Sequence, residues 1–252
     1  MNIRAVVFDL DGTAIPVEVS GKPSKKVISA VSKSKTLVKV SAATGRPFYS
    51  CERILKALNI NEPCIVSGGS QIVDPATGAV LWEKYMDAEK VALVMAVVKD
   101  YPYKIYTSDN PILLSPSEIE GLRSERVIYV MYVDREETED MVKRLRAIDG
   151  IDAHAMASWE KGKLDVHITH KDATKRNAMK ELLRMLDVKK EQVMVVGDGG
   201  NDLPLFEESG FRVAMGNAGE ALKSKADHIT GNVENDGLAM ALEKYVIRNG
   251  KI

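Results

Sequence analysis

The stretch Ile3–Thr13, with the sequence IRAVVFDLDGT, decides the fold. Its apolar, β-branched part ends at Phe8 and predicts a short buried strand. Asp9 and Asp11 come directly after that strand, and the pair Asp11-Gly12 is typical of a turn. Open α/β sheets bind their ligands at the carboxyl ends of the strands, so two carboxylates at this place suggest a functional site. The motif taken alone fits an acidic turn equally well.

Strands and helices alternate in the two outer parts of the chain, which is the pattern of a parallel α/β sheet. The predicted strands after the first are residues 37–42, 64–66, 193–197 and 212–215. The predicted helices are residues 23–34, 47–58, 175–186, 202–208 and 235–246. Pro47 suits the first turn of its helix, because a proline there gives up no helical hydrogen bond. The fold class is therefore α/β.

The middle of the chain has a different pattern. Residues 71–73 and 80–82 flank a turn with Pro75 and Gly78, which predicts a hairpin. The elements predicted beyond it are helices at 88–99 and 134–148, strands at 103–107, 112–114 and 127–133, and a hairpin formed by 153–157 and 163–169. We therefore predict that residues 83–168 form a separate α+β unit, inserted between residues 1–82 and 169–252.

Composition argues against several classes of function. The chain has 252 residues with 35 Lys and Arg against 36 Asp and Glu, and a net charge of −1 argues against nucleic-acid binding as its main task. The longest apolar run, Val91–Val98, is far too short for a membrane span, and no signal-peptide segment is evident. Cys51 and Cys64 are expected to be free thiols. We expect a cytoplasmic monomer or small homo-oligomer with no nucleic-acid or membrane partner.

Three further segments carry polar side chains that suit a reaction at phosphorus. Thr44, Gly45 and Arg46 follow the second strand at a helix start, where a hydroxyl, backbone N–H groups and a guanidinium suit a phosphate. Lys175 lies near the start of a later helix. The loop Gly197–Asp202, GDGGND, holds two carboxylates and a carboxamide, which suit a hard cation. Each segment also has an ordinary explanation as a helix cap, a turn or a solvated lysine.

The order of these segments favours function, because a parallel sheet brings its strand ends to one edge. Several Asp carboxylates in one crevice repel each other strongly without a cation, and Mg²⁺ would relieve that repulsion. One Asp could then attack phosphorus to form an aspartyl-phosphate. A second carboxylate two residues later could protonate the leaving oxygen and afterwards activate water.

The ordered set of motifs resembles the haloacid dehalogenase (HAD) superfamily of phosphatases, in its Cof-type branch with a C2B cap. The resemblance covers nearly the whole chain. It is carried by FDLDGT at 8–13, TGRP at 44–47, Lys175, GDGGND at 197–202, AMGNA at 214–218 and NDG at 235–237. It implies a Rossmann-like parallel-sheet catalytic core over residues 1–82 and 169–252, with an inserted α+β cap domain over residues 83–168.

By this resemblance, Asp9 is the nucleophile and Asp11 is the general acid and base. Mg²⁺ is then held by the carboxylates of Asp9 and Asp198 and the backbone carbonyl of Asp11, and Asp202 supports the metal through water or a neighbouring contact. The residues implied in phosphate binding are Thr44, Gly45, Lys175 and Asn201. Arg46 is a further candidate for substrate contact, and the candidates for contacts between the cap and the leaving group are Trp159, Lys161, Lys163 and His167. The two lysines also suit a solvated turn, and the tryptophan also suits packing.

The resemblance implies a Mg²⁺-dependent phosphatase that acts on a small phosphorylated metabolite. Sugar phosphates are the first class of substrate that it suggests, and phosphoglycolate is the next. Asp11 favours a phosphatase or a phosphomutase, because the dehalogenases and P-type ATPases of this superfamily differ at that position. A phosphomutase would pass the phosphoryl group to another hydroxyl, and a receiver-like signalling module would keep it on the protein.

Overall fold

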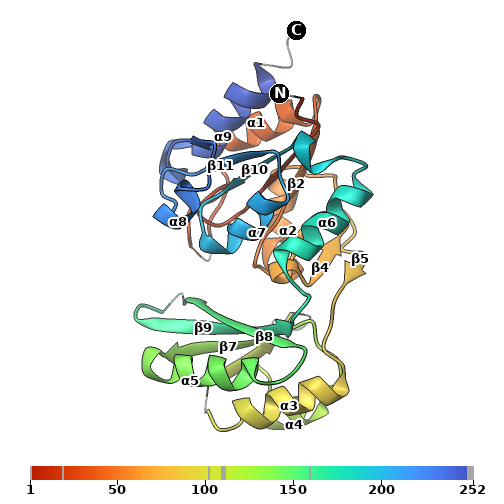
Figure 1. Ribbon diagram of the computed structural model, residues 1–252, viewed down its shortest axis with the longest axis vertical. Helices are drawn as coiled ribbons and strands as arrows, with labels where there is room; N and C mark the ends of the chain where they lie inside the picture. The colour runs from red at the N-terminus through yellow and green to blue at the C-terminus, as the bar shows by residue number, and fades with distance from the viewer. Residues whose placement is uncertain (1, 19, 102, 109–111, 159, 249–252) are drawn as a thin grey trace. The chain divides into compact units, whose positions relative to one another are not determined.

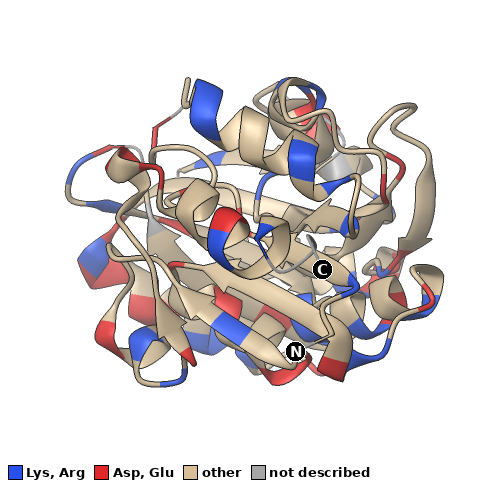
Figure 2. Ribbon diagram, turned by 90° about the horizontal axis from the view of Figure 1, so that it is seen from above, with Lys and Arg blue, Asp and Glu red and all other residues tan. Residues whose placement is uncertain are grey.

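The computed structural model describes residues 2–18, 20–101, 103–108, 112–158 and 160–248. The chain divides into two compact units, one formed by Met1–Trp82 with Thr174–Ile252 and the other by Glu83–Ala173. Acidic and basic residues are interspersed along the helices and loops (Figure 2), in keeping with the small net charge. Within the described ranges, no helix is both long and apolar enough to cross a membrane.

The first unit is built on a parallel sheet with five strands (Figure 1). In the order β12-β11-β10-β1-β2, these strands are His228–Ile229, Phe211–Ala214, Val193–Gly197, Ala5–Phe8 and Lys39–Ala42. All four residues of β1 are buried, and the strand pairs in parallel with β10 on one side and β2 on the other. The carboxyl end of β1 therefore lies inside the sheet edge, between the carboxyl ends of β10 and β2.

Helices cover both faces of this sheet, and β1 sends alternate side chains to the two faces. The helices in chain order are α1 Lys25–Ser34, α2 Phe48–Ala57, α6 Lys175–Met185, α7 Leu203–Glu207, α8 Glu220–Lys223 and α9 Gly237–Leu242. Val6 and Phe8 pack in one core cluster with α1, α2 and α9, while Ala5 and Val7 pack in the other with α6, α7 and α8. Two helical layers around a parallel sheet confirm the predicted fold class.

A small second sheet completes the first unit. It contains β3 (Cys64–Val66), β4 (Gln71–Val73) and β5 (Val80–Glu83) in that order. The prediction of a hairpin from residues 71–82 is thus confirmed. Residues 64–66 pair antiparallel with β4, and Ile65 also forms a parallel bridge with Ala43, directly after β2. The predicted link to the parallel sheet is thus present as a single bridge and not as a full strand. The 3-10 turn η1 (Ser67–Gly69) connects β3 to β4.

The second unit is an antiparallel sheet with helices. The strands in the order β6-β7-β9-β8 are Lys104–Thr107, Val127–Asp134, Lys163–His170 and Ile151–Ala157. Its helices are α3 Ala88–Val98, α4 Pro116–Gly121 and α5 Arg135–Arg146. A separate core cluster joins α3 and α5 to the sheet. The predicted strand at 112–114 is wrong, because these residues are irregular and lead into α4, whose first turn carries a capping box from Ser115 and Glu118.

Candidate active site

The loop that follows β1 is folded tightly against the loop that follows β10. Gly12 has a φ of +74°, and a Cβ at this position would lie 2.1 Å from Oδ2 of Asp198. The hydroxyl of Thr13 donates to Oδ1 of Asp198 at 3.2 Å. Only glycine permits this backbone angle together with such a close approach, so the DxDGT motif is fitted to the Asp198 carboxylate.

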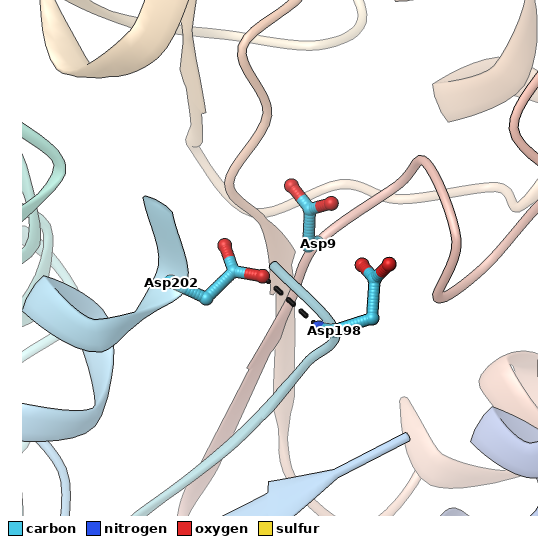
Figure 3. A group of neighbouring side chains, drawn as sticks. All are labelled: Asp9, Asp198 and Asp202. Atoms are coloured by element: carbon cyan, nitrogen blue, oxygen red, sulfur yellow. Dashed lines mark hydrogen bonds between the residues drawn. The ribbon is translucent and has the colours of Figure 1, made fainter. Parts of the chain in front are cut away.

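Three carboxylates meet at this edge of the sheet (Figure 3). Asp9, Asp198 and Asp202 each offer an oxygen within 4.8 Å of the others. Asp9 is buried and follows β1, while Asp198 and Asp202 come from the loop and 3-10 turn after β10. The structure therefore brings together the acidic residues of two motifs that are far apart in the sequence.

Lys175, the first residue of α6, lies between two of these carboxylates. Its Nζ donates to Oδ1 of Asp9 at 2.9 Å and to Oδ1 of Asp202 at 2.7 Å. The side chain is only 4% exposed, so the alternative of a solvated lysine is wrong. Burial lowers the pKa of Lys175, but the charges of Asp202 and Asp9 outweigh this effect and raise it. The ammonium group therefore stays charged.

One lysine does not balance three carboxylates. Burial raises the pKa of Asp9 well above its usual value, the charge of Asp202 adds to the rise, and Lys175 offsets it only in part. Burial and the charge of Asp202 also raise the pKa of Asp198 to about 6. Such a group suits a divalent cation, because the added positive charge would stabilise the ionised form of each acid.

The hydrogen bonds distinguish the carboxylates that are free to bind a cation. Asp202 accepts from Lys175 with one oxygen and from the N–H groups of Asp198 and Gly199, both at 3.1 Å, with the other. Its oxygens are thus used to hold Lys175 and the loop. Asp9 and Asp198 receive fewer donors, so they fit the part of direct metal ligands better than Asp202 does.

The loop after β2 supplies Thr44, Gly45 and Arg46. The Thr44 hydroxyl oxygen accepts from the N–H of Arg46 at 3.1 Å, which leaves the hydroxyl proton for another acceptor. A Cβ on Gly45 would meet nothing within 4 Å, so the space beside this backbone is open. The guanidinium of Arg46 is paired with Asp11, an interaction that the sequence does not predict.

Asn201 and Asn217 lie on the loops beside Asp198. The exposed Asn201 folds back so that a Cβ on Gly199 would lie 2.1 Å from its Oδ1. The side chain of Asn217 donates to the carbonyl of Gly12 at 2.9 Å and to Asp198 at 3.4 Å. Asn217 belongs to the AMGNA motif, and no single-residue signal in that motif indicates these contacts.

The candidates for leaving-group contacts in the second unit have simple surroundings. Lys161 is exposed, and Lys163 donates to Asp134 at 2.7 Å. His167 is half-buried, with its ring 4.6 Å from that of Tyr129 in an edge-on arrangement. The remaining candidate, Trp159, lies outside the described residues.

Comparison with known proteins gives the family. The model of the haloacid dehalogenase-like hydrolases matches residues 6–127 and 106–242. The chain belongs to this family. The 5-amino-6-(5-phospho-D-ribitylamino)uracil phosphatase YcsE of Bacillus subtilis is 23% identical over 251 residues, which are 98% of this chain and 97% of that protein. Phosphoglycolate phosphatase 1 of Saccharolobus solfataricus is 43% identical over 81 residues, but these are only 32% of this chain and 36% of that protein.

Solved structures show the same fold over nearly the whole chain. The HAD phosphatase BT1666 of Bacteroides thetaiotaomicron has a TM-score of 0.80 at 24% identity, with 97% of this chain and 96% of that chain covered. The HAD subclass IIB sugar phosphatase BT4131 has a TM-score of 0.77 at 21% identity, with 97% and 99% covered. The family match and the full-length relatives confirm the prediction of a HAD-family phosphatase of the Cof type, and the solved structures confirm its fold. A receiver-like module is thereby set aside.

Proposed function

We propose that the protein is a Mg²⁺-dependent phosphatase that hydrolyses a sugar phosphate or a similar small phosphomonoester through an aspartyl-phosphate. The observation that carries this proposal is the buried Asp9–Lys175–Asp202 group at the carboxyl end of β1, with Asp198 beside it. A buried carboxylate that is held by a lysine at the carboxyl end of an inner strand is well placed to act as a nucleophile.

In the first half of the reaction, an oxygen of Asp9 attacks phosphorus. The Asp9–phosphorus bond forms, the ester bond breaks, and Asp11 gives its proton to the leaving oxygen. In the second half, water attacks the phosphorus while the Asp11 carboxylate takes a proton from it. The bond to Asp9 then breaks, inorganic phosphate leaves, and both aspartates return to their starting forms.

The surrounding residues position the reacting groups. Lys175 orients Asp9 by its hydrogen bond of 2.9 Å and offsets negative charge on the phosphoryl oxygens. Thr44 donates its free hydroxyl proton to one of those oxygens, and Gly45 and Asn201 border the same space. The carboxylates of Asp9 and Asp198 and the backbone carbonyl of Asp11 would hold Mg²⁺. When bound, the ion stabilises the negative charge that develops on the transferring group.

We assign the cap role to the second unit, Glu83–Ala173. Caps exclude water from the reaction and contact the leaving group, so we expect this unit to determine the substrate. The sugar-phosphate class is supported by the likeness to the sugar phosphatase BT4131 and by the full-length match to YcsE, whose named substrate carries a phosphorylated ribityl chain. The match to phosphoglycolate phosphatase 1 is higher in identity but local, so phosphoglycolate is the second candidate.

Phosphate release tests the proposal directly. The wild-type protein is assayed with hexose and pentose phosphates, a ribityl phosphate, phosphoglycolate and p-nitrophenyl phosphate, in Mg²⁺ and in EDTA. Asp9→Asn keeps the shape of the side chain but removes the nucleophile, so turnover should disappear. Asp149→Asn makes the same chemical change on a fully exposed side chain and should retain it. If wild-type protein released phosphate from none of these esters, or released it equally in EDTA, the proposal would fail.

A phosphomutase would give a different product from the same assay. It would convert a sugar phosphate into an isomeric ester with little free phosphate, which nuclear magnetic resonance of phosphorus distinguishes from hydrolysis. We expect free phosphate as the main product.

A further inference from the structure

The carboxylate of Asp11 is bound by two hydrogen bonds from a buried arginine. Nε of Arg46 donates to Oδ2 of Asp11 at 2.8 Å, and Nη2 donates to Oδ1 at 2.5 Å. The same Nη2 also donates to the carbonyl of Glu18 at 3.0 Å. Arg46 is only 9% exposed. Two parallel bonds from a guanidinium hold a carboxylate plane in one orientation more firmly than a single bond does.

The main chain of Arg46 is held as firmly as its side chain. Its N–H donates to the hydroxyl of Thr44 at 3.1 Å, and its carbonyl accepts from the N–H of Ser67 at 2.8 Å. The backbone from which the Arg46 side chain extends is therefore held in place in the loop after β2. Asp11, by comparison, is 26% exposed on a loop and is not a member of the Asp9–Asp198–Asp202 group.

We infer that Arg46 is a positioning residue that fixes the orientation of the Asp11 carboxylate and so acts on the reaction through Asp11. This inference rests on the proposed function, in which Asp11 transfers the proton of the leaving group. The interaction uses one lone pair on each carboxylate oxygen and leaves another on each for that proton. Arg46 then has a different part from the direct substrate contact predicted from the sequence.

The leaving group separates the two roles of Arg46. An ester of an acidic phenol loses a stable anion and needs little help from Asp11. An ester of a weakly acidic phenol needs a proton on the oxygen as the bond to phosphorus breaks. If Arg46 acts through Asp11, the decrease in kcat/KM caused by replacing Arg46 grows as the leaving group becomes more basic. If Arg46 binds the phosphoryl group, which is common to all of these esters, the decrease in kcat/KM is the same for each ester.

The experiment measures kcat/KM for a series of substituted phenyl phosphates, from p-nitrophenyl phosphate to phenyl phosphate, in Mg²⁺. The variants are Arg46→Met, Arg46→Lys, Asp11→Asn and the double variant R46M/D11N. Arg212→Met is the matched control, because Arg212 makes a similar two-bond pair with Asp227 at 2.9 and 2.8 Å on the start of β11. Circular dichroism and thermal unfolding show which variants are folded.

We expect R46M to lower kcat/KM for phenyl phosphate by at least about tenfold. This is less than the roughly 10²–10⁴-fold contribution of a general acid, because Asp11 itself is still present. The decrease for p-nitrophenyl phosphate should be much smaller. R46K keeps the positive charge but cannot make two parallel hydrogen bonds, so its kcat/KM for phenyl phosphate should lie between those of R46M and the wild type. In the double variant, removing Arg46 should add less than about twofold to the loss caused by D11N. Arg212→Met should leave kcat/KM unchanged for both substrates.

Two results would overturn the inference: an equal loss on all esters in R46M, or a further large loss when R46M is added to D11N. If R46M does not fold, the slope of the series in R46K decides instead. A wild-type protein that hydrolyses no ester would refute the proposed phosphatase itself, whereas wild-type turnover with a flat response to Arg46 would refute only the role of Arg46.

Discussion

Replacing Gly69 with alanine should disturb the start of α6, where Lys175 lies. Gly69 ends the turn η1 with a φ of +104°. A Cβ there would lie 2.3 Å from the carbonyl carbon of Thr174 and 2.4 Å from the nitrogen of Lys175. Both are backbone atoms, so no side chain can turn aside to make room. The neighbouring Gly68 also has a positive φ, +68°, but its Cβ would meet nothing within 4 Å.

The two glycines therefore form a matched pair. A side chain at positive φ costs roughly 1–2 kcal/mol, and both Gly68→Ala and Gly69→Ala carry this cost. Only Gly69→Ala adds a clash, and overpacking costs typically about 1–3 kcal/mol. The expected loss in the free energy of unfolding is the sum, about 2–5 kcal/mol for Gly69→Ala, against roughly 1–2 kcal/mol for Gly68→Ala.

Urea denaturation and phosphate release measure the two consequences separately. We expect Gly69→Ala to have the lower urea midpoint, and its folded fraction to release phosphate more slowly because Lys175 is displaced from Asp9. Gly68→Ala should keep most of its turnover per folded molecule. Equal midpoints and equal turnover in the two variants would show that η1 does not set the position of α6, and the reasoning would be refuted.

Three other changes have clear expected outcomes. Lys175→Met should abolish turnover and lower the free energy of unfolding by about 3–5 kcal/mol, because it leaves the buried carboxylates of Asp9 and Asp202 without their cation; an unchanged urea midpoint would contradict this. The raised pKa of Asp198, about 6, favours the metal-free fold at low pH and costs stability as the pH rises from roughly 4 to 6. Added Mg²⁺ should therefore raise the thermal midpoint more at about pH 7.5 than at about pH 5, and equal rises would argue against Asp198 as a ligand. Ser24→Ala removes the N-cap of α1 and a bond to Asp236 and should cost about 1 kcal/mol with turnover unchanged, as chemical denaturation and phosphate release can check.

The parallel core and its acidic edge could be predicted from the sequence for a simple physical reason. A buried strand of a parallel sheet is a short apolar run, and the next residues lie at the edge that binds ligands. Asp9 and Asp198 both follow such runs, so their meeting required only that β1 and β10 belong to one sheet. Their separation in the chain was no obstacle, because the sheet places both strand ends together.

Elements with weak local signals were harder to predict. The apolar residues 112–114 predict a strand, but Ser115 and Glu118 form a capping box that starts α4 just after them. Residues 64–66 have the pattern of a buried parallel strand, but they make only a parallel bridge from Ile65 to Ala43 and pair along their length with the antiparallel β4. A short apolar run predicts burial in both cases and does not determine the hydrogen-bonding partner.

The partner of each charged side chain is the part of the site that depends most on the complete fold. Arg46 and Lys175 are both basic residues beside a strand end or a helix start, and the sequence suggests phosphate for both. In the structure Lys175 lies on Asp9 and Asp202, while Arg46 takes both oxygens of Asp11. A pairing depends on how close two side chains come on loops that are distant in the chain, and local sequence does not determine that distance. The pairing of these two basic side chains also determines which carboxylates remain to bind a cation. The different roles of the aspartates therefore follow from where Arg46 and Lys175 pack.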